Sequence, residues 1–382
     1  MLGRLSFGLA AHPNLELDGK NRKQAVALLL ESVNTTIDAP PPGWLAYTFG
    51  QIPANLPLSK DALRKFQNAR NKLRREQRQD LKRWWFHQIA TGRSPVAERL
   101  VLFWHNFFTT EINMLPNPAM SWQQQLVLRQ HALGNYRHLL RAMNQDPALL
   151  WYLDNHLNKK KKPNENYARE LLELYTLGEG NYSEGDIKEL ARTMTGAGVD
   201  SASWTYLFRR GQHDNAEKTF LGTRGNLHPD QVIDIILRQK QASEYLVRRL
   251  WTEFVSPLPD QKIVAEMAAV FRRHDYELKP LLQALFEHPA FWASENRMTL
   301  VKSPVELLVG THLSAGKPVD DYKKAVIALA EMGQDLFNPP DVGGWPAGKE
   351  WINSVRLARR HQYQIGVAEP SPSQLKLDYQ LK

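Results

Sequence analysis

Residues 163–178 read PNENYARELLELYTLG. Apolar side chains recur here every three or four positions, so a helix would carry them on one side and most charged side chains on the other. Gly178 suits the end of such a helix, because glycine readily adopts the left-handed conformation found at helix C-termini. The pattern predicts an amphipathic helix over residues 165–177.

A second predicted helix follows closely. Ser183-Glu184-Gly185-Asp186 has the spacing of a capping box, and apolar side chains at helical spacing continue to Thr195. Residues 178–182 leave room only for a short turn, so we expect the two helices to pack as a hairpin. Carboxylates of both helices would then face a shared cleft.

Helical signals also dominate outside this hairpin. Ser94-Pro95 and Ser303-Pro304 each combine a cap with a first-turn proline, and Glu306 completes a capping box with Ser303. Strand signals are confined to residues 204–208 and 218–221, which we expect to pair as one small β-hairpin. Residues 337–346, FNPPDVGGWP, have too much proline and glycine for a helix and too many aromatic residues for a free linker.

The predicted fold class is therefore mainly α. We expect a single large helical domain over residues 1–363, with one small β-hairpin and the Pro/Gly-rich C-terminal segment packed on it. Residues 364–382 are expected to form a C-terminal tail.

Composition excludes several classes of protein. The 382 residues include no cysteine, which rules out a thiol nucleophile, an iron–sulfur cluster and a thiolate zinc site. No stretch approaches the ~18 apolar residues of a membrane span. Residues 1–11 lack the pattern of a signal peptide, and the absence of cysteine suits both reducing and oxidising compartments. Nothing in the sequence calls for haem or flavin.

The net charge of +9 is unevenly distributed. Residues 60–93 contain eleven Lys and Arg against three Asp and Glu, with apolar residues at roughly helical spacing. This pattern predicts a long basic helix, and residues 159–162 form a second, shorter basic run. The charge is either a solvated helix face or a docking surface for a polyanion such as a glycan or nucleic acid.

Polar residues in and around the predicted hairpin are the candidate site. Asn166, Glu170 and Glu173 share one column of the first helix, and Glu165 can pair with Arg169. The catalytic candidates are His105, Glu165, Arg169, Glu170 and His213. The substrate-binding candidates are Asp154, Asn155, Asn164 and Asn166.

Three interpretations of these residues stay open. The carboxylates could bind a divalent metal, with Glu170, Glu173, Asp186 and Glu189 as candidate ligands and a histidine nitrogen beside them. They could act as general acid and base without a metal, as in glycoside hydrolysis. They could also form an ion-pair network with Arg169 and Arg192 that performs no chemistry.

Several segments, taken in order, resemble one bacterial family, the domain-of-unknown-function family 1800. The resemblance spans roughly residues 5–360 and is carried by Trp104-His105-Asn106, Tyr152-Leu153-Asp154-Asn155, Pro163-Asn164-Glu165-Asn166-Tyr167-Ala168-Arg169-Glu170-Leu171, Thr193-Met194-Thr195-Gly196, His213-Asp214, Lys218-Thr219-Phe220-Leu221-Gly222, Lys302-Ser303-Pro304-Val305-Glu306 and Pro339-Pro340-Asp341-Val342-Gly343-Gly344-Trp345-Pro346.

The resemblance implies an exported or periplasmic protein. It also implies a partner from family 1501, which resembles the alkaline phosphatase and sulfatase superfamily. Ala197 and Ala216 depart from the family pattern, which has Trp and Gly there in many members, so a site near these two residues would be altered in this chain.

Two functional hypotheses follow, and the sequence leaves open whether the protein is an enzyme. The first is an exported enzyme or enzyme-like protein that acts on an anionic extracellular polymer. In it, Glu165 or Glu170 is a general base or metal ligand, and Arg169 holds an anionic group. The alternative is a non-catalytic binding or assembly factor that uses the basic helix.

Overall fold

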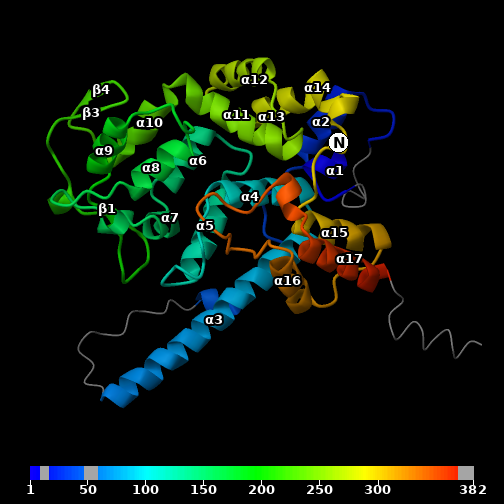
Figure 1. The fold of residues 1–382 in the computed structure, drawn as a ribbon, viewed down its shortest axis with the longest axis horizontal. Coiled ribbons are helices and arrows are strands. Elements are labelled where there is room, and N and C mark those ends of the chain that lie inside the picture. Colours follow the sequence, from blue (N-terminus) through cyan, green and yellow to red (C-terminus); the bar gives the residue numbers. More distant parts are fainter. Residues whose placement is uncertain (9–16, 47–58, 369–382) are drawn as a thin grey trace, which may run out of the picture.

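The computed structural model describes residues 1–8, 17–46 and 59–368, and this part of the chain is mainly helical, as predicted (Figure 1). The first half contains α1 (Leu2–Leu5), α2 (Arg22–Glu31), α3 (Lys60–Thr91), α4 (Pro95–Phe107), α5 (Ala119–Gln130), α6 (Tyr136–Met143), α7 (Pro147–Tyr152), α8 (Asn166–Glu173) and α9 (Glu184–Thr193), with short 3-10 helices at Gly43–Ala46 and Asn155–Leu157.

Four short strands and the remaining helices complete the described chain. They are β1 (Ala197–Val199), β2 (Tyr206–Phe208), β3 (Lys218–Phe220), β4 (Thr223–Gly225), α10 (Val232–Leu237), α11 (Lys240–Phe254), α12 (Gln261–Arg273), α13 (Leu278–Glu287), α14 (Pro289–Trp292), α15 (Pro304–Ala315), α16 (Tyr322–Glu331) and α17 (Ser354–Ala368), with 3-10 helices at Arg210–Gln212, Pro229–Gln231, Ser294–Asn296 and Gly348–Trp351.

Helix α4 runs through the hydrophobic core. Nearly all of its residues are buried, and the indole of Trp104 stacks on Tyr136 of α6 and donates a hydrogen bond to Ala132 O at 2.9 Å. A buried indole NH needs such a partner, because leaving it unpaired would cost free energy. Phe103 of α4 also lies against Phe254, with ring centroids 6.0 Å apart, so segments from both halves of the chain pack around the α4 aromatic side chains.

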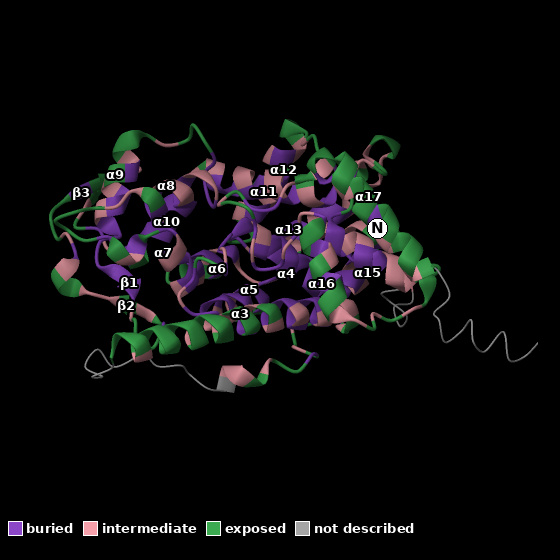
Figure 2. Ribbon diagram, turned by 60° about the horizontal axis from the view of Figure 1, so that its bottom comes forward, coloured by how far each residue is buried: buried purple, intermediate pink, exposed green. Residues whose placement is uncertain are grey.

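Helix α3 is half in the core and half outside it. Leu81, Trp84 and Trp85 are buried, whereas most residues before Gln77 are exposed, and the N-terminal half projects from the body (Figures 1 and 2). Ser59 caps the helix by accepting a hydrogen bond from Ala62 N at 3.2 Å. The predicted long basic helix is thus present.

The strands form two separate two-stranded antiparallel sheets. We expected residues 204–208 to pair with residues 218–221, but β2 pairs with β1 and β3 pairs with β4. The predicted partner was wrong because β1, AGV, is too short to give a period-two signal. A small β component on a mainly helical fold is confirmed.

The Pro/Gly-rich segment packs on the helical body, as predicted. Phe337 lies against Trp85, with ring centroids 4.8 Å apart, and its carbonyl accepts a hydrogen bond from Ile112 N at 2.8 Å. Trp345 N donates to Asn106 Oδ1 of α4 at 2.7 Å. The predicted tail begins within α17, and residues 369–382 lie outside the described residues. Among the described helices, none is both long and apolar enough to cross a bilayer.

Candidate functional site

The predicted hairpin of α8 and α9 is confirmed, and an ion pair joins its helices. Arg169 pairs with Glu184 through both terminal nitrogens, at 2.9 and 3.0 Å, and lies 3.8 Å from Glu165. The side chains of Arg169 and Glu165 are 38% and 41% exposed. An ion pair this exposed is screened by solvent and contributes little to stability. The catalytic roles of Glu165 and Arg169 stay predictions.

Glu170 is more buried than Glu165 and Arg169. Burial raises the pKa of its carboxyl, the neighbouring Glu173 raises it further, and Arg169 opposes both effects. Burial, Glu111 and Asp341 raise the pKa of the Tyr152 phenol, and the charge of Glu170 raises it further. A carboxyl with a raised pKa suits general acid–base chemistry, and this is the property that the sequence hypothesis requires of Glu170.

Asn155 and Asn158 form a buried pair that holds backbone segments together. Asn155 Nδ2 donates to Ala197 O at 2.8 Å, and Asn155 Oδ1 accepts from Asn158 Nδ2 at 3.0 Å. Asn158 Nδ2 also donates to Ala191 O at 2.8 Å. Because Asn155 is 1% exposed and bonded in this way, it fixes the loop before α8 against α9 and β1.

The other three substrate-binding candidates lie nearer the surface. Asn164 N donates to Asn158 Oδ1 at 3.0 Å, and Asn164 Oδ1 accepts from Asn166 N at 3.0 Å. Asn166 is exposed, as is Asp154, which has a left-handed backbone with φ of 60°. Substrate binding by these side chains stays a prediction.

The acidic residues of α9 bind the backbone of β3 and of the residue after it. Asp186 accepts from Leu221 N at 2.8 Å and completes the predicted capping box with Ser183. Glu189 accepts from Thr219 N at 3.0 Å and pairs with Arg192 at 2.9 Å. These bonds draw Asp186 and Glu189 towards the sheet, whereas Glu170 and Glu173 lie on α8.

The four candidate metal ligands therefore do not converge on one point. Across the described ranges, no group of three or more His, Asp or Glu side chains is placed to hold a metal ion. The helical wheel identified which face of each helix is polar, but it could not show that the carboxylates of α9 are already occupied by β3.

His105 lies in the aromatic core. Its ring is 4.7 Å from that of Trp85, 5.2 Å from Phe337 and 5.3 Å from Trp345, and the residue is 1% exposed. Neither ring nitrogen has a hydrogen-bond partner in the described part of the chain. Burial lowers the pKa of His105 to about 3, so the ring is neutral at ordinary pH. Its surroundings give it no contact with Glu165, Arg169 or Glu170.

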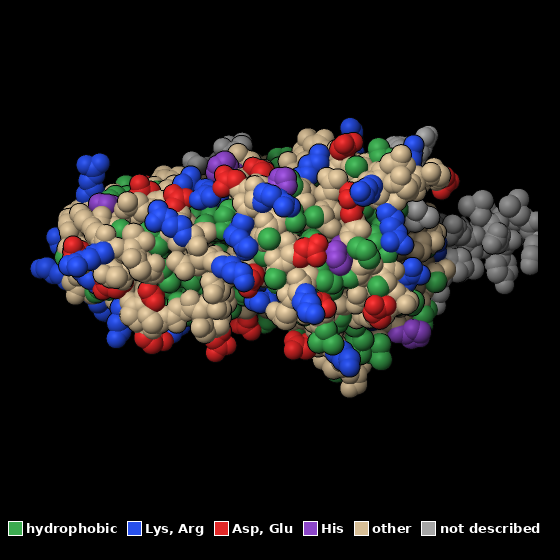
Figure 3. Space-filling view, turned by 90° about the horizontal axis from the view of Figure 1, so that it is seen from above, with side chains coloured by type: hydrophobic (Ala, Val, Ile, Leu, Met, Phe, Trp, Pro, Cys, Tyr) green, Lys and Arg blue, Asp and Glu red, His purple; other side chains and the backbone are tan. Residues whose placement is uncertain are grey.

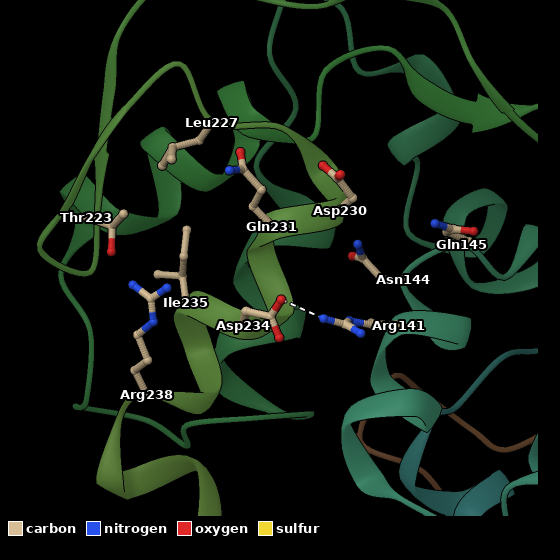
Figure 4. Close-up of a pocket in the computed structure, with 10 residues that line it drawn as sticks. All are labelled: Arg141, Asn144, Gln145, Thr223, Leu227, Asp230, Gln231, Asp234, Ile235 and Arg238. Carbon is tan, nitrogen blue, oxygen red and sulfur yellow. Dashed lines mark hydrogen bonds and ion pairs between the residues drawn. The ribbon is translucent and has the colours of Figure 1, made fainter.

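His213 borders a cavity of about 500 Å³ between β2 and the 3-10 helix Pro229–Gln231 that precedes α10. Its Nδ1 bonds to Thr195 O at 2.9 Å, its ring stacks on His228 at 4.6 Å, and its buried Nε2 lacks a partner among the described residues. A neighbouring cavity of about 490 Å³ shares Gln145 and Asp230 with it, and there Arg141 reaches Asp234 at 2.6 Å (Figure 4). His213 therefore lies at a cavity of its own, away from the aromatic core around His105 and from the candidate residues of α8.

The largest of the described cavities was not predicted. It has a volume of about 1100 Å³ and lies between α1, α4, the end of α11, the loop before α15 and the Pro/Gly-rich segment. On its wall, the buried Arg99 pairs with Glu253 and, at 3.2 Å, with Glu306. Burial opposes the Arg99 charge, but Glu306 and Glu253 outweigh burial and raise the guanidinium pKa.

The comparison with known families gives one match. The model of the family described as Protein of unknown function (DUF1800) matches residues 1–379. The chain belongs to this family. The comparisons with curated proteins and with solved structures found no match.

Three of the DUF1800 segments quoted from the sequence meet at the largest cavity. They supply Asn106 from the first, Lys302, Ser303 and Glu306 from the second, and Trp345 with Pro346 from the third. These segments are about 200 and 40 residues apart along the chain, so periodicity within any one of them could not reveal the cavity. The signal available in the sequence was the capping box of residues 303–306, which places Glu306 at the start of α15.

Proposed function

We propose that the protein binds an anionic polymer through the projecting half of α3, which is the alternative hypothesis from the sequence. The observation that carries the proposal is the exposure of a row of cations without carboxylate partners. Lys60, Arg64, Lys72 and Arg75 are exposed, and the described residues provide no ion pair to any of them. From Lys60 to Arg75 the helix extends over roughly 22 Å, at 1.5 Å per residue.

A second row of cations runs along the same half of the helix. Arg70, Arg74 and Arg78 are four residues apart and therefore neighbours on one face. Burial lowers the pKa of Arg74, and the charges of Arg70 and Arg78 lower it further. Arg78 donates to the carbonyls of Asn113 and Leu115 at 3.3 and 3.2 Å, so uncharged groups are its partners. An anionic polymer along α3 would relieve this repulsion between like charges.

The opposite side of the molecule has a different charge distribution. Figure 3 views that side, and its Lys and Arg side chains are interspersed with Asp and Glu. Strong non-specific attraction of a polyanion requires several cations close together with few anions between them. The projecting half of α3 meets this requirement.

The enzyme hypothesis shares the same class of ligand but finds less support. It needs His105, His213 and the α8 residues to act on one substrate. These groups lie in the aromatic core, beside a separate cavity and on a partly exposed helix face, respectively. Binding of a polymer by α3 does not require residues from distant segments to meet at one site. Polymer binding is therefore our leading proposal.

The test is a triple substitution that removes exposed charge only. Arg64→Gln, Lys72→Gln and Arg75→Gln together should weaken binding to a duplex DNA or heparin fragment and leave the circular dichroism spectrum unchanged. For DNA, the slope of log affinity against log salt should fall by about 3, since each lost phosphate contact removes about 0.9. Fluorescence anisotropy at several salt concentrations measures both quantities.

Lys160→Gln, Lys161→Gln and Lys162→Gln provide the matched control. These substitutions remove the same charge from an exposed loop before α8. The control variant should bind as the parent does. If both triple variants lose the same affinity, net charge and not α3 is responsible, and if neither loses any, the proposal is wrong.

A further inference from the structure

The largest cavity contains charge that its own lining does not balance. Its walls include five cationic and three anionic side chains: Arg4, Arg99, Arg297, Lys302 and Lys349, and Glu253, Glu306 and Glu350. Arg99 is already matched by Glu253 and Glu306. The unmatched positive charge therefore resides mainly on Arg4 and Arg297 and on the two lysines.

Arg4 is fixed in place by groups that carry no charge. Its terminal nitrogens donate to the carbonyls of Phe291 and, at 3.4 Å, Val255, and its guanidinium carbon lies 3.6 Å from the centre of the Phe291 ring. Burial lowers the pKa of Arg4 to about 10, and Arg297 adds to the effect. Arg297 lines the same cavity, so the two guanidinium groups face a common space in which their like charges repel.

Arg297 has its terminal nitrogens available. Its Nε donates to Trp292 O at 3.2 Å, and among the described residues no hydrogen bond or ion pair involves Nη1 or Nη2. A guanidinium in this state presents two parallel N–H donors, the geometry that binds carboxylate, phosphate and sulfate oxygens in bidentate fashion. Since Nε is anchored, part of the entropy cost of ordering the side chain is already met before a ligand arrives.

The remaining lining is largely apolar. Trp292, Trp345 and Trp351 contribute aromatic surface, and Leu102, Leu300 and Val301 contribute aliphatic surface. A volume of about 1100 Å³ accommodates a small organic molecule, and cavities that bind such ligands combine apolar walls with a few fixed polar groups.

We propose that this cavity binds a small ligand that carries an oxyanion on a ring or hydrocarbon body, with Arg297 and Arg4 holding the oxyanion. The inference is independent of polymer binding by α3, since it involves other residues and a ligand with one anionic group. The ligand's oxyanion is a carboxylate, phosphate or sulfate, each of which has two oxygen atoms that can accept the parallel N–H bonds of a guanidinium.

The test measures the thermal stability of the purified full chain with four probes at constant ionic strength: inorganic phosphate, inorganic sulfate, glucuronate and glucose 6-phosphate. Uncharged glucose is the negative probe. A ligand that binds only the folded state raises the melting temperature in proportion to the logarithm of its concentration. At least one anionic probe should do so, and glucose should not. If none of the four stabilises the protein, the proposal is overturned.

Substitution of Arg297 assigns the effect to the cavity. Arg297→Gln should weaken binding of the active probe at least tenfold. Arg297→Lys keeps the charge but lacks the two parallel N–H donors, so its affinity should lie between those of Arg297→Gln and the parent. Arg238→Gln, which removes a guanidinium from the lining of the cavity in Figure 4, is the matched control and should bind as the parent does.

The triple substitution in α3 should also leave probe affinity unchanged, which separates this proposal from the first. Because Arg297 is exposed, its variants are expected to fold, and calorimetric titration of each confirms affinity where melting temperatures differ. Unchanged affinity in Arg297→Gln, or equal loss in Arg238→Gln, contradicts the assignment.

Discussion

Two histidines that were equally attractive in the sequence have different surroundings. Both are 1% exposed. His213 bonds to Thr195 through Nδ1 and lines a cavity with its neighbour His228. The ring of His105 instead packs against Trp85, Phe337 and Trp345. Burial lowers the pKa of both, and for His105 to about 3. At the scale of the residue, His105 is therefore a core side chain with two unsatisfied nitrogens.

This environment predicts a pH-dependent gain in stability for His105→Leu. The parent's folded state binds fewer protons than its unfolded state between the folded pKa of about 3 and the ordinary 6.5, so its stability is complete above pH 6.5 and falls as the pH is lowered. Leucine does not titrate. At pH 7.5 the free energy of unfolding should change by less than about 1.5 kcal/mol, since the swap nearly conserves volume and removes unpaired polar atoms.

Below pH 6.5 the variant should gain on the parent by up to about 1.4 kcal/mol per pH unit. Urea unfolding at pH 7.5, 6 and 5 measures the difference. A variant that is several kcal/mol less stable at every pH would mean that the ring has hydrogen-bond partners in solution.

At the scale of the element, α9 is held to the β3–β4 sheet by its own acidic side chains. Asp186 caps the first turn and accepts from Leu221 N, and burial of this carboxylate is outweighed by its hydrogen bonds, so its pKa is lowered. Glu184 on the same turn is exposed and pairs with Arg169. Two carboxylates on one helix turn thus have different roles: Asp186 joins α9 to the end of β3, whereas Glu184 lies on the surface.

Asp186→Ala should destabilise the protein by about 1–3 kcal/mol, because it removes a helix cap and leaves a strand-end N–H without its acceptor. Glu184→Ala, the control on the same turn, should cost clearly less than Asp186→Ala, because its exposed ion pair is screened by solvent. Chemical denaturation of both variants gives the comparison. If the two substitutions cost the same, the bond from Leu221 N to Asp186 contributes nothing to the stability of the fold.

At the scale of the whole molecule, the Pro/Gly-rich segment closes the fold onto α4. Gly344 has φ of 97°, and a Cβ there would lie 2.4 Å from Asn106 Oδ1, the atom that accepts the hydrogen bond from Trp345 N. Only glycine allows this approach. The contact joins two segments more than 230 residues apart, and on one side of it lies the largest cavity.

Gly344→Ala should therefore lower the free energy of unfolding by about 2–4 kcal/mol, from backbone strain and from the displaced Asn106. Gly348→Ala is the control, because Gly348 also has positive φ, 55°, but has open space around it. It should cost about 1 kcal/mol of strain alone. Equal losses in equilibrium unfolding would show that the contact with Asn106 is not required.

Local patterns in the sequence determined the helical class, the α8–α9 hairpin, the basic α3 helix and the capping boxes at Ser183 and Ser303, all of which are present in the structure. Each depends on residues within a few turns of one another, where spacing alone decides which side chains share a face. The packing of residues 337–346 on the helical body was also predictable, since exposing the aromatic side chains of this segment to solvent would be unfavourable.

Only the tertiary structure decided which polar groups meet. Asn155 was a substrate-binding candidate and Asp186 a candidate metal ligand, but they bind the backbone at Ala197 and Leu221. His105, a catalytic candidate, faces Trp85 and Phe337. Arg4 and Arg297 are almost the length of the chain apart and come together in a cavity that no local pattern indicates. The reason is physical: a buried polar group takes whichever partner the packing of distant segments brings to it.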